Sequence, residues 1–162
     1  MAVSFTSFTL PRAAVTAHVL LTAGDSRPGQ LFVSERVPQH DGPETVLEML
    51  NRPEPFFAFR PDHEKKEAAL LVSKTHTVSV AVDHQAPIAD PARLNAAKVL
   101  ELELVLAGGS TLRGHASVEL PPHQSRLLDY LNSSREAFFV VWTDATTYHV
   151  NRDHVLYARP LD

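Results

Sequence analysis

The sequence predicts a mainly β protein with short helices, built as two tandem small five-stranded antiparallel barrels, each with a helix between strands 2 and 3. Two observations carry this prediction. Residues 13–83 and residues 98–158 present the same patterns in the same order, and each stretch contains runs that alternate between apolar and polar residues, as strands do. The predicted division is a first β-barrel repeat at residues 1–83, a linker at 84–97 and a second β-barrel repeat at 98–162.

The first strand of each repeat is predicted from alternating apolar residues. These are Val15, Ala17, Val19 and Leu21 in the first repeat, and Leu100, Leu102, Leu104 and Leu106 in the second. Such alternation puts one face of a strand on a core and the other in water. Since a slip of one residue would exchange the two faces, the shared parity indicates a shared fold.

A glycine turn follows each first strand, at Gly24 and at Gly108-Gly109. The next strand is expected after a second glycine, Gly29 or Gly114, over residues 30–34 and 115–120. Two alternating runs separated by a short turn predict a β-hairpin.

A short helix is expected next in each repeat, over residues 43–51 and 125–132. Pro43 suits a first helical turn and Ser125 an N-cap, and each segment carries an apolar stripe on one side. An aromatic-rich buried strand follows, at residues 56–59 and 138–142, and then a polar turn.

The last block of each repeat has the most particular pattern. A small polar residue, a cation, a variable residue and a histidine recur before an apolar strand: Ser73, Lys74, Thr75 and His76, then Asn151, Arg152, Asp153 and His154. We interpret Ser73, His76, Asn151 and His154 as structural residues of a tight turn, because such side chains bond nearby backbone groups. Between the repeats, two prolines and little apolar periodicity predict the linker.

Five short strands offer too little area for two packed sheets, so each repeat is expected to close into a small barrel that hides its edges. A domain of about 60 residues buries only about 60% of its unfolded surface. Each repeat alone would therefore be marginally stable, and pairing of the repeats or assembly of chains would add burial.

The strand order and last block resemble the Sm-like barrel, a ring-forming fold of the SH3-like kind. Asn151 to His154, followed by an apolar strand, looks like the Arg-Gly-Asn-Asn type turn of that family, without its glycine. The resemblance implies that Lys74 and Arg152 are the nucleic-acid-binding residues, if that surface is retained. Asp129 and Asn132 are spaced differently from the family's first motif, so no base contact is assigned to them.

Composition limits the other functions. The net charge of −4 argues against a protein that mainly grips phosphate backbones, and DNA is not expected as a partner. The chain has no cysteine, which excludes thiolate chemistry and fits a reducing compartment, and no run approaches a membrane span. We expect a cytoplasmic protein without a membrane partner.

Two site hypotheses compete with simpler interpretations of the same residues. The second repeat carries His115, His123, His149 and His154, but their spacing matches no known zinc pattern, so no metal is predicted. Glu101 and Glu103 lie on the outward face of a strand, where a solvated surface is the simpler interpretation.

The sequence therefore favours a non-enzymatic binding or assembly module without a cofactor, whose partner is another copy of the chain or a different protein. An Sm-like RNA-binding protein is the alternative, and a metal-dependent hydrolase is the second alternative.

Overall fold

The computed structural model describes residues 12–63, 69–83, 98–118, 126–133 and 135–161. In the first half these residues form β1 (Arg12–Leu21), β2 (Ser26–Ser34), α2 (Val46–Asn51), β3 (Phe56–Pro61), β4 (Leu70–Ser73), the 3-10 turn η1 (Lys74–His76) and β5 (Thr77–Asp83). In the second half they form β6 (Lys98–Leu106), β7 (Thr111–Val118), α4 (Leu127–Ser133), β8 (Phe138–Trp142), β9 (Thr146–Asn151), η3 (Arg152–His154) and β10 (Val155–Pro160). The predicted linker at 84–97 and the predicted cap Ser125 lie outside the described residues.

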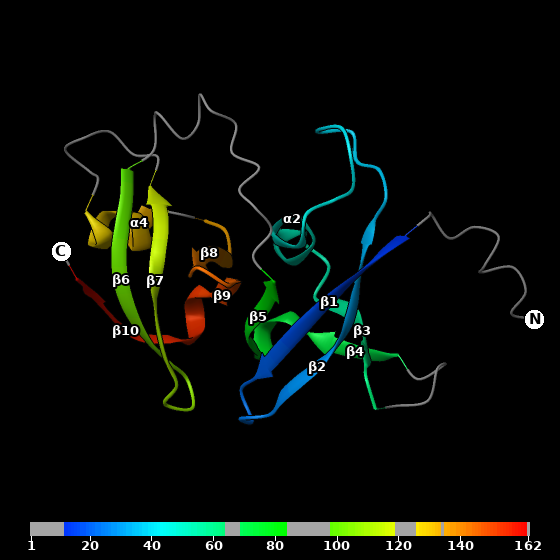
Figure 1. Cartoon of the computed structure of the whole chain (residues 1–162), viewed down its shortest axis with the longest axis horizontal. Helices are drawn as coiled ribbons and strands as arrows, with labels where there is room; N and C mark the ends of the chain where they lie inside the picture. Colours follow the sequence, from blue (N-terminus) through cyan, green and yellow to red (C-terminus); the bar gives the residue numbers. More distant parts are fainter. Residues whose placement is uncertain (1–11, 64–68, 84–97, 119–125, 134, 162) are drawn as a thin grey trace, which may run out of the picture.

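All ten strands belong to one open antiparallel sheet, in the order β10-β6-β7-β8-β9-β5-β1-β2-β3-β4 (Figure 1). The prediction of a mainly β chain with short helices is confirmed, but the prediction of two closed five-stranded barrels is wrong. Closure would need the outer strands of each half to pair with each other. Instead β5, an outer strand of the first half, pairs with β9, an outer strand of the second half.

The two halves have the same internal topology. The order is β5-β1-β2-β3-β4 in one half and β10-β6-β7-β8-β9 in the other, with a helix between the second and third strands of each. The hairpin registers also correspond, since Ala17 pairs with Gly29 and Leu102 with Gly114. A register shift falls at the same place in the β1–β5 and β6–β10 ladders. The descent of both halves from one duplicated unit stays a prediction. Such a duplication would produce halves that correspond in topology and register.

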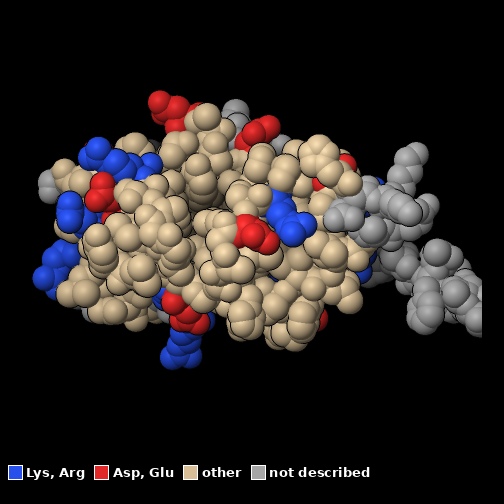
Figure 2. All heavy atoms as spheres, turned by 90° about the horizontal axis from the view of Figure 1, so that it is seen from below, with Lys and Arg blue, Asp and Glu red and all other residues tan. Residues whose placement is uncertain are grey.

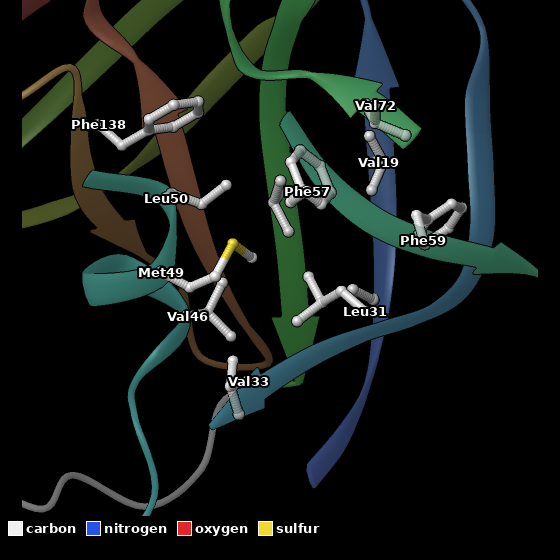
Figure 3. Packing of buried hydrophobic residues seen from close by; sticks show 12 residues of the cluster. Val19, Leu31, Val33, Val46, Met49, Leu50, Phe57, Phe59, Val72 and Phe138 are labelled. Carbon is white, nitrogen blue, oxygen red and sulfur yellow. The ribbon is translucent and has the colours of Figure 1, made fainter. Parts of the chain in front are cut away.

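Each half has its own buried cluster, and the alternating residues of its first two strands supply much of it. In the first half, Val46, Met49 and Leu50 of α2 pack against β-strand residues that include Leu31 and Phe57 (Figure 3). The clusters also exchange residues, because Phe138 of the second half joins the first cluster and Val78 of the first half joins the second. The halves are therefore interlocked through side chains as well as through the β5–β9 ladder.

Helix α2 begins at a capping box rather than at Pro43. Thr45 is the N-cap, its side chain accepts from the Glu48 backbone N–H at 3.1 Å, and the Glu48 carboxylate accepts from the Thr45 N–H at 2.8 Å. These reciprocal bonds satisfy two backbone donors that the first turn leaves free. Neither helix that the structure describes has the length and apolarity needed to cross a bilayer.

The paired glycines Gly29 and Gly114 lie inside strands β2 and β7, not at the ends of the hairpin turns as expected. A Cβ atom built on Gly29 would lie 2.2 Å from the Arg60 carbonyl oxygen, and one built on Gly114 would lie 2.5 Å from the Trp142 carbonyl oxygen. Since both contacts are with backbone of the neighbouring strand, only glycine allows this approach.

We predict that Gly29→Ala and Gly114→Ala each lower the free energy of unfolding by about 1–3 kcal/mol, because the added methyl forces the adjacent strand to move. Thr111→Ala, at an exposed position of β7, is the control and should change it by less than about 0.5 kcal/mol. Urea denaturation measures the free energy of unfolding of all three variants. Equal stability of the glycine variants and the control would contradict the close approach.

Candidate functional site

The candidate site is centred on the two 3-10 turns, which follow the fourth strand of each half. The four residues predicted to build tight turns lie on or directly beside them: Ser73, His76, Asn151 and His154. Ser73 and Asn151 hold the N-cap positions, and only the Asn151 side chain caps its turn, by accepting from the Asp153 N–H at 3.0 Å. The first turn is held differently, with the Ser73 hydroxyl 3.1 Å from Nδ1 of His76.

Lys74 and Arg152, the predicted nucleic-acid-binding residues, make equivalent hydrogen bonds to the helix of their own half. The Lys74 ammonium donates to the carbonyls of Met49 at 2.8 Å and Arg52 at 3.1 Å. Arg152 donates through Nη1 to the Leu131 carbonyl at 2.7 Å. These carbonyls lie at the C-terminal ends of α2 and α4, where a cation satisfies free acceptors and meets the negative end of the helix dipole.

Burial lowers the pKa of the Lys74 ammonium, and the nearby Arg52 guanidinium lowers it further. Arg152 also packs its guanidinium over the Phe139 ring at 5.0 Å. Both cations therefore fasten an inserted helix to the turn that follows. A role for Lys74 and Arg152 in nucleic-acid binding stays a prediction.

The two turns meet at the seam, which we define as the β5–β9 ladder and the contacts beside it. The Asn151 amide, buried, donates to the carbonyls of Lys74 at 3.2 Å and Thr77 at 3.0 Å. Nε2 of His154 lies 2.6 Å from the Thr75 carbonyl. One turn thus uses its side chains to hold the backbone of the other.

His149 lies on β9 within the seam and is buried. Its Nδ1 is 3.0 Å from the Val80 carbonyl on β5, to which it donates. Burial lowers the pKa of the imidazole, because the charged form is poorly solvated there, and the bond to Val80 offsets this only in part. The neutral ring is therefore the form that the seam accommodates.

An open groove of about 420 Å³ runs along the seam. Aliphatic side chains line part of it, and its polar lining is mostly hydroxyl groups, with one imidazole and one carboxylate: Ser26, Ser79, Ser110, Thr111, Thr146, Tyr148, His18 and Asp83. The groove is bounded by residues of both halves, and it exists because the two halves share one sheet.

The remaining site hypotheses are placed as follows. Among the described residues, no group of three or more His, Asp or Glu side chains is arranged to hold a metal ion. Glu101 is exposed, whereas the Glu103 side chain is only 20% exposed and lies between Arg113 and Arg159 on neighbouring strands, 3.6 Å from each. Trp142 is half-buried and stacks with His115, their ring centroids 6.0 Å apart.

The outer strands of the sheet, β4 and β10, have one described neighbour each, and their side chains differ from those at the seam. The structure-based alignment of the halves equates Leu71 of β4 with His149, and Leu156 and Tyr157 of β10 with Val78 and Ser79. Leu71, Leu156 and Tyr157 are 74%, 61% and 55% exposed. Their counterparts at the seam are 5%, 0% and 6% exposed. Equivalent positions are thus buried where the two halves meet, but carry exposed apolar side chains on the outer strands.

Comparison with protein-family models, with curated proteins and with solved structures gives no match. The Sm-like resemblance therefore stays a prediction. The chain's own two halves are the comparison that informs the site.

Sequence reasoning missed the seam and the helix contacts of the two cations. The alignment of Lys74 with Arg152 was a sufficient signal that they share a role, but not of which role. The pattern Thr45-Val46-Leu47-Glu48 has the spacing of a capping box and could have placed the start of α2. No local signal identifies the partner of His149, which is 69 residues away.

We predict that Asn151→Ala lowers the free energy of unfolding by about 1–3 kcal/mol, because the buried carbonyls of Lys74 and Thr77 lose a donor. Ser73→Ala is the matched control at the equivalent turn, where the hydroxyl bonds exposed groups, and should change it by less than about 0.5 kcal/mol. Urea denaturation of both variants checks this. Similar losses at both turns would contradict a seam held by Asn151.

We also predict that His149 makes stability fall with acidification. Its folded-state pKa lies below the ordinary histidine value of 6.5, so the unfolded chain takes up the proton first, and stability present above pH 6.5 is lost as pH falls below it. His149→Leu, which installs the residue of the equivalent first-half position, should remove this component. Denaturation midpoints of the two proteins across that pH range test it, and parallel pH profiles would refute the assignment.

Proposed function

We propose that this chain is a non-enzymatic binding and assembly module that acts through the outer strands of its sheet, β4 and β10. The observation that carries the proposal is the contrast between the seam and the edges. Large apolar side chains stand exposed on both outer strands, at positions that are buried where the halves meet.

Strand β4 lacks the features that usually protect a sheet edge, whereas β10 carries them only near its two ends, with a register shift beside Val155 and Arg159-Pro160 at the other end. Natural edges are blunted by charged residues, prolines or bulges, because an unprotected edge offers free N–H and C=O groups to another strand. Strand β4 reads Leu-Leu-Val-Ser with no charge, and β10 places its Arg159 and Pro160 only at the end. Addition of a strand to such an edge combines main-chain bonds with apolar contacts, as in β-augmentation.

The two alternative functions have less support. On the face shown in Figure 2, basic side chains gather toward one end with acidic ones among them, and most of that face is uncharged. Lys74 is buried and donates to carbonyls at the end of α2, and Arg152 donates through Nη1 to a carbonyl of α4, which does not favour phosphate binding. The buried Nη2 of Arg152 has no hydrogen-bond partner among the described residues. A metal-dependent hydrolase would need convergent ligands, and the described residues do not supply them.

Site-specific photo-crosslinking tests the proposal. We predict that a photoreactive amino acid at Leu71 or Leu156 becomes joined to another protein chain in the source cells, because both side chains stand on an open edge. The same probe at Leu128, which is exposed on α4 and belongs to neither outer strand, is the control. Equal crosslinking at all three positions, or none at the two edge positions, would contradict the proposal.

A further inference from the structure

We infer that the partner for these edges is a second copy of the chain, bound head to tail, with β4 of one copy paired antiparallel to β10 of the next. The inference rests on the proposed function and names the partner of the same site. It is argued from the β5–β9 ladder, because that ladder already joins a fourth strand of one half to a fifth strand of the other. The outer strands β4 and β10, each with one neighbour among the described strands, are the remaining fourth and fifth strands.

The seam fixes the expected register between copies. Within the chain, Val150 pairs with Ser79, His149 with Val80 and Tyr148 with Ala81. Substitution of each residue by its counterpart in the other half gives the pairs between copies: Val72 with Tyr157, Leu71 with Ala158 and Leu70 with Arg159. This register keeps the faces of the sheet continuous, since a slip of one residue would turn the side chains of one strand to the opposite face.

Pairing in this register would bury the apolar side chains that the isolated chain exposes. Leu71 would take the place that His149 has at the seam, while Leu156 and Tyr157 would take the places of Val78 and Ser79. Removal of such surface from water is favourable in proportion to its area. The same contact would pair the backbone groups of both edges.

Charges near the edges are balanced within each side in this arrangement. The groove at the seam is bounded by the tip of the β6–β7 hairpin on one side and by β1 and β5 on the other. At a junction between copies, the equivalent positions carry Asp25 and Arg27 on one side and Glu103 and Arg159 on the other. Asp25 pairs with Arg27 at 3.5 Å on one side and Glu103 with Arg159 at 3.6 Å on the other, so each side is neutral and the two sides would not repel each other.

The turn contacts would also repeat. His154 reaches the Thr75 carbonyl across the seam, whereas the described side-chain contacts of its first-half counterpart, His76, stay within its own turn. At a junction between copies His76 would reach the Asp153 carbonyl of the next chain. This gives His76 a role that its contacts within η1 do not explain.

Such a contact is heterologous, because it joins two different surfaces. Each added copy leaves one β4 edge and one β10 edge free, so assembly continues until the rotation closes a ring or extends a filament. A two-fold contact between two β4 strands, by contrast, would stop at a dimer and leave β10 unused.

The test measures native mass by sedimentation of the full chain. The wild-type chain should assemble beyond the dimer. Leu71→Lys and Tyr157→Lys, which place a charge on β4 and β10 respectively, should each weaken self-association about tenfold or more, because Lys is a natural blocker of edge pairing. Leu128→Lys, at the exposed position on α4, is the matched control and should assemble like the wild type.

Mixing the two edge variants gives the decisive result. Leu71→Lys keeps an intact β10 edge and Tyr157→Lys keeps an intact β4 edge, so an equimolar mixture should form a one-to-one dimer and nothing larger. Circular dichroism of each variant establishes that it is folded. A mixture that stays monomeric, or a variant that loses assembly while the other edge variant keeps it, would overturn head-to-tail pairing.

Failure of this inference can be told apart from failure of the proposed function. A monomeric wild-type chain whose edge probes crosslink to a different protein overturns the second copy as partner and leaves the edges as a binding site. A monomeric chain whose edge probes crosslink to nothing overturns both.

Discussion

The pairing of β5 with β9 is the interaction on which the rest of this structure depends. β5 follows η1 in the first half, yet it pairs with β1 on one side and with β9 on the other. Its residues Thr77 to Val80 are consequently all buried, and Val78 packs in the cluster of the second half. Phe138 packs reciprocally in the first cluster. Neither half has a complete core without the other, which fits the small burial that units of this size achieve alone.

The sequence predicted the local elements well because their causes are local. Alternation over residues 15–21 and 100–106 decides which side chains face a core, and the structure buries Val19, Leu102 and Leu104 as expected. Closure into barrels was wrong because alternation says nothing about which strand lies beyond an edge. That choice was made between β5 and β9, strands separated along the chain by most of the second half. Gly29 and Gly114 were expected at the ends of turns. They are instead required by the close approach of a neighbouring strand, which the sequence does not reveal.

The candidate site was predictable in place but not in role. Aligning the halves put Ser73, His76, Asn151 and His154 at equivalent turns, and the structure has them there. The same alignment treated Ser73 and Asn151 as interchangeable small polar residues. Asparagine reaches across the seam to two carbonyls, while the serine hydroxyl stays within its own turn. The difference between the two residues reflects whether a neighbouring unit is present, and only the assembled sheet supplies that information.

Differences between equivalent positions follow from how each junction would form. The seam joins two parts of one chain, so its partners meet at a high effective concentration and need little apolar area. His149, Ser79 and Asn151 serve there, with hydrogen bonds to fix the register. A junction between separate copies must offset the loss of translational and rotational freedom at the protein's real concentration. Leu71 and Tyr157, which replace His149 and Ser79 on the outer strands, would supply more apolar surface for that purpose. Under the proposed pairing between copies, one geometry would be used twice, and the side chains would differ because only one of the two junctions has a covalent link.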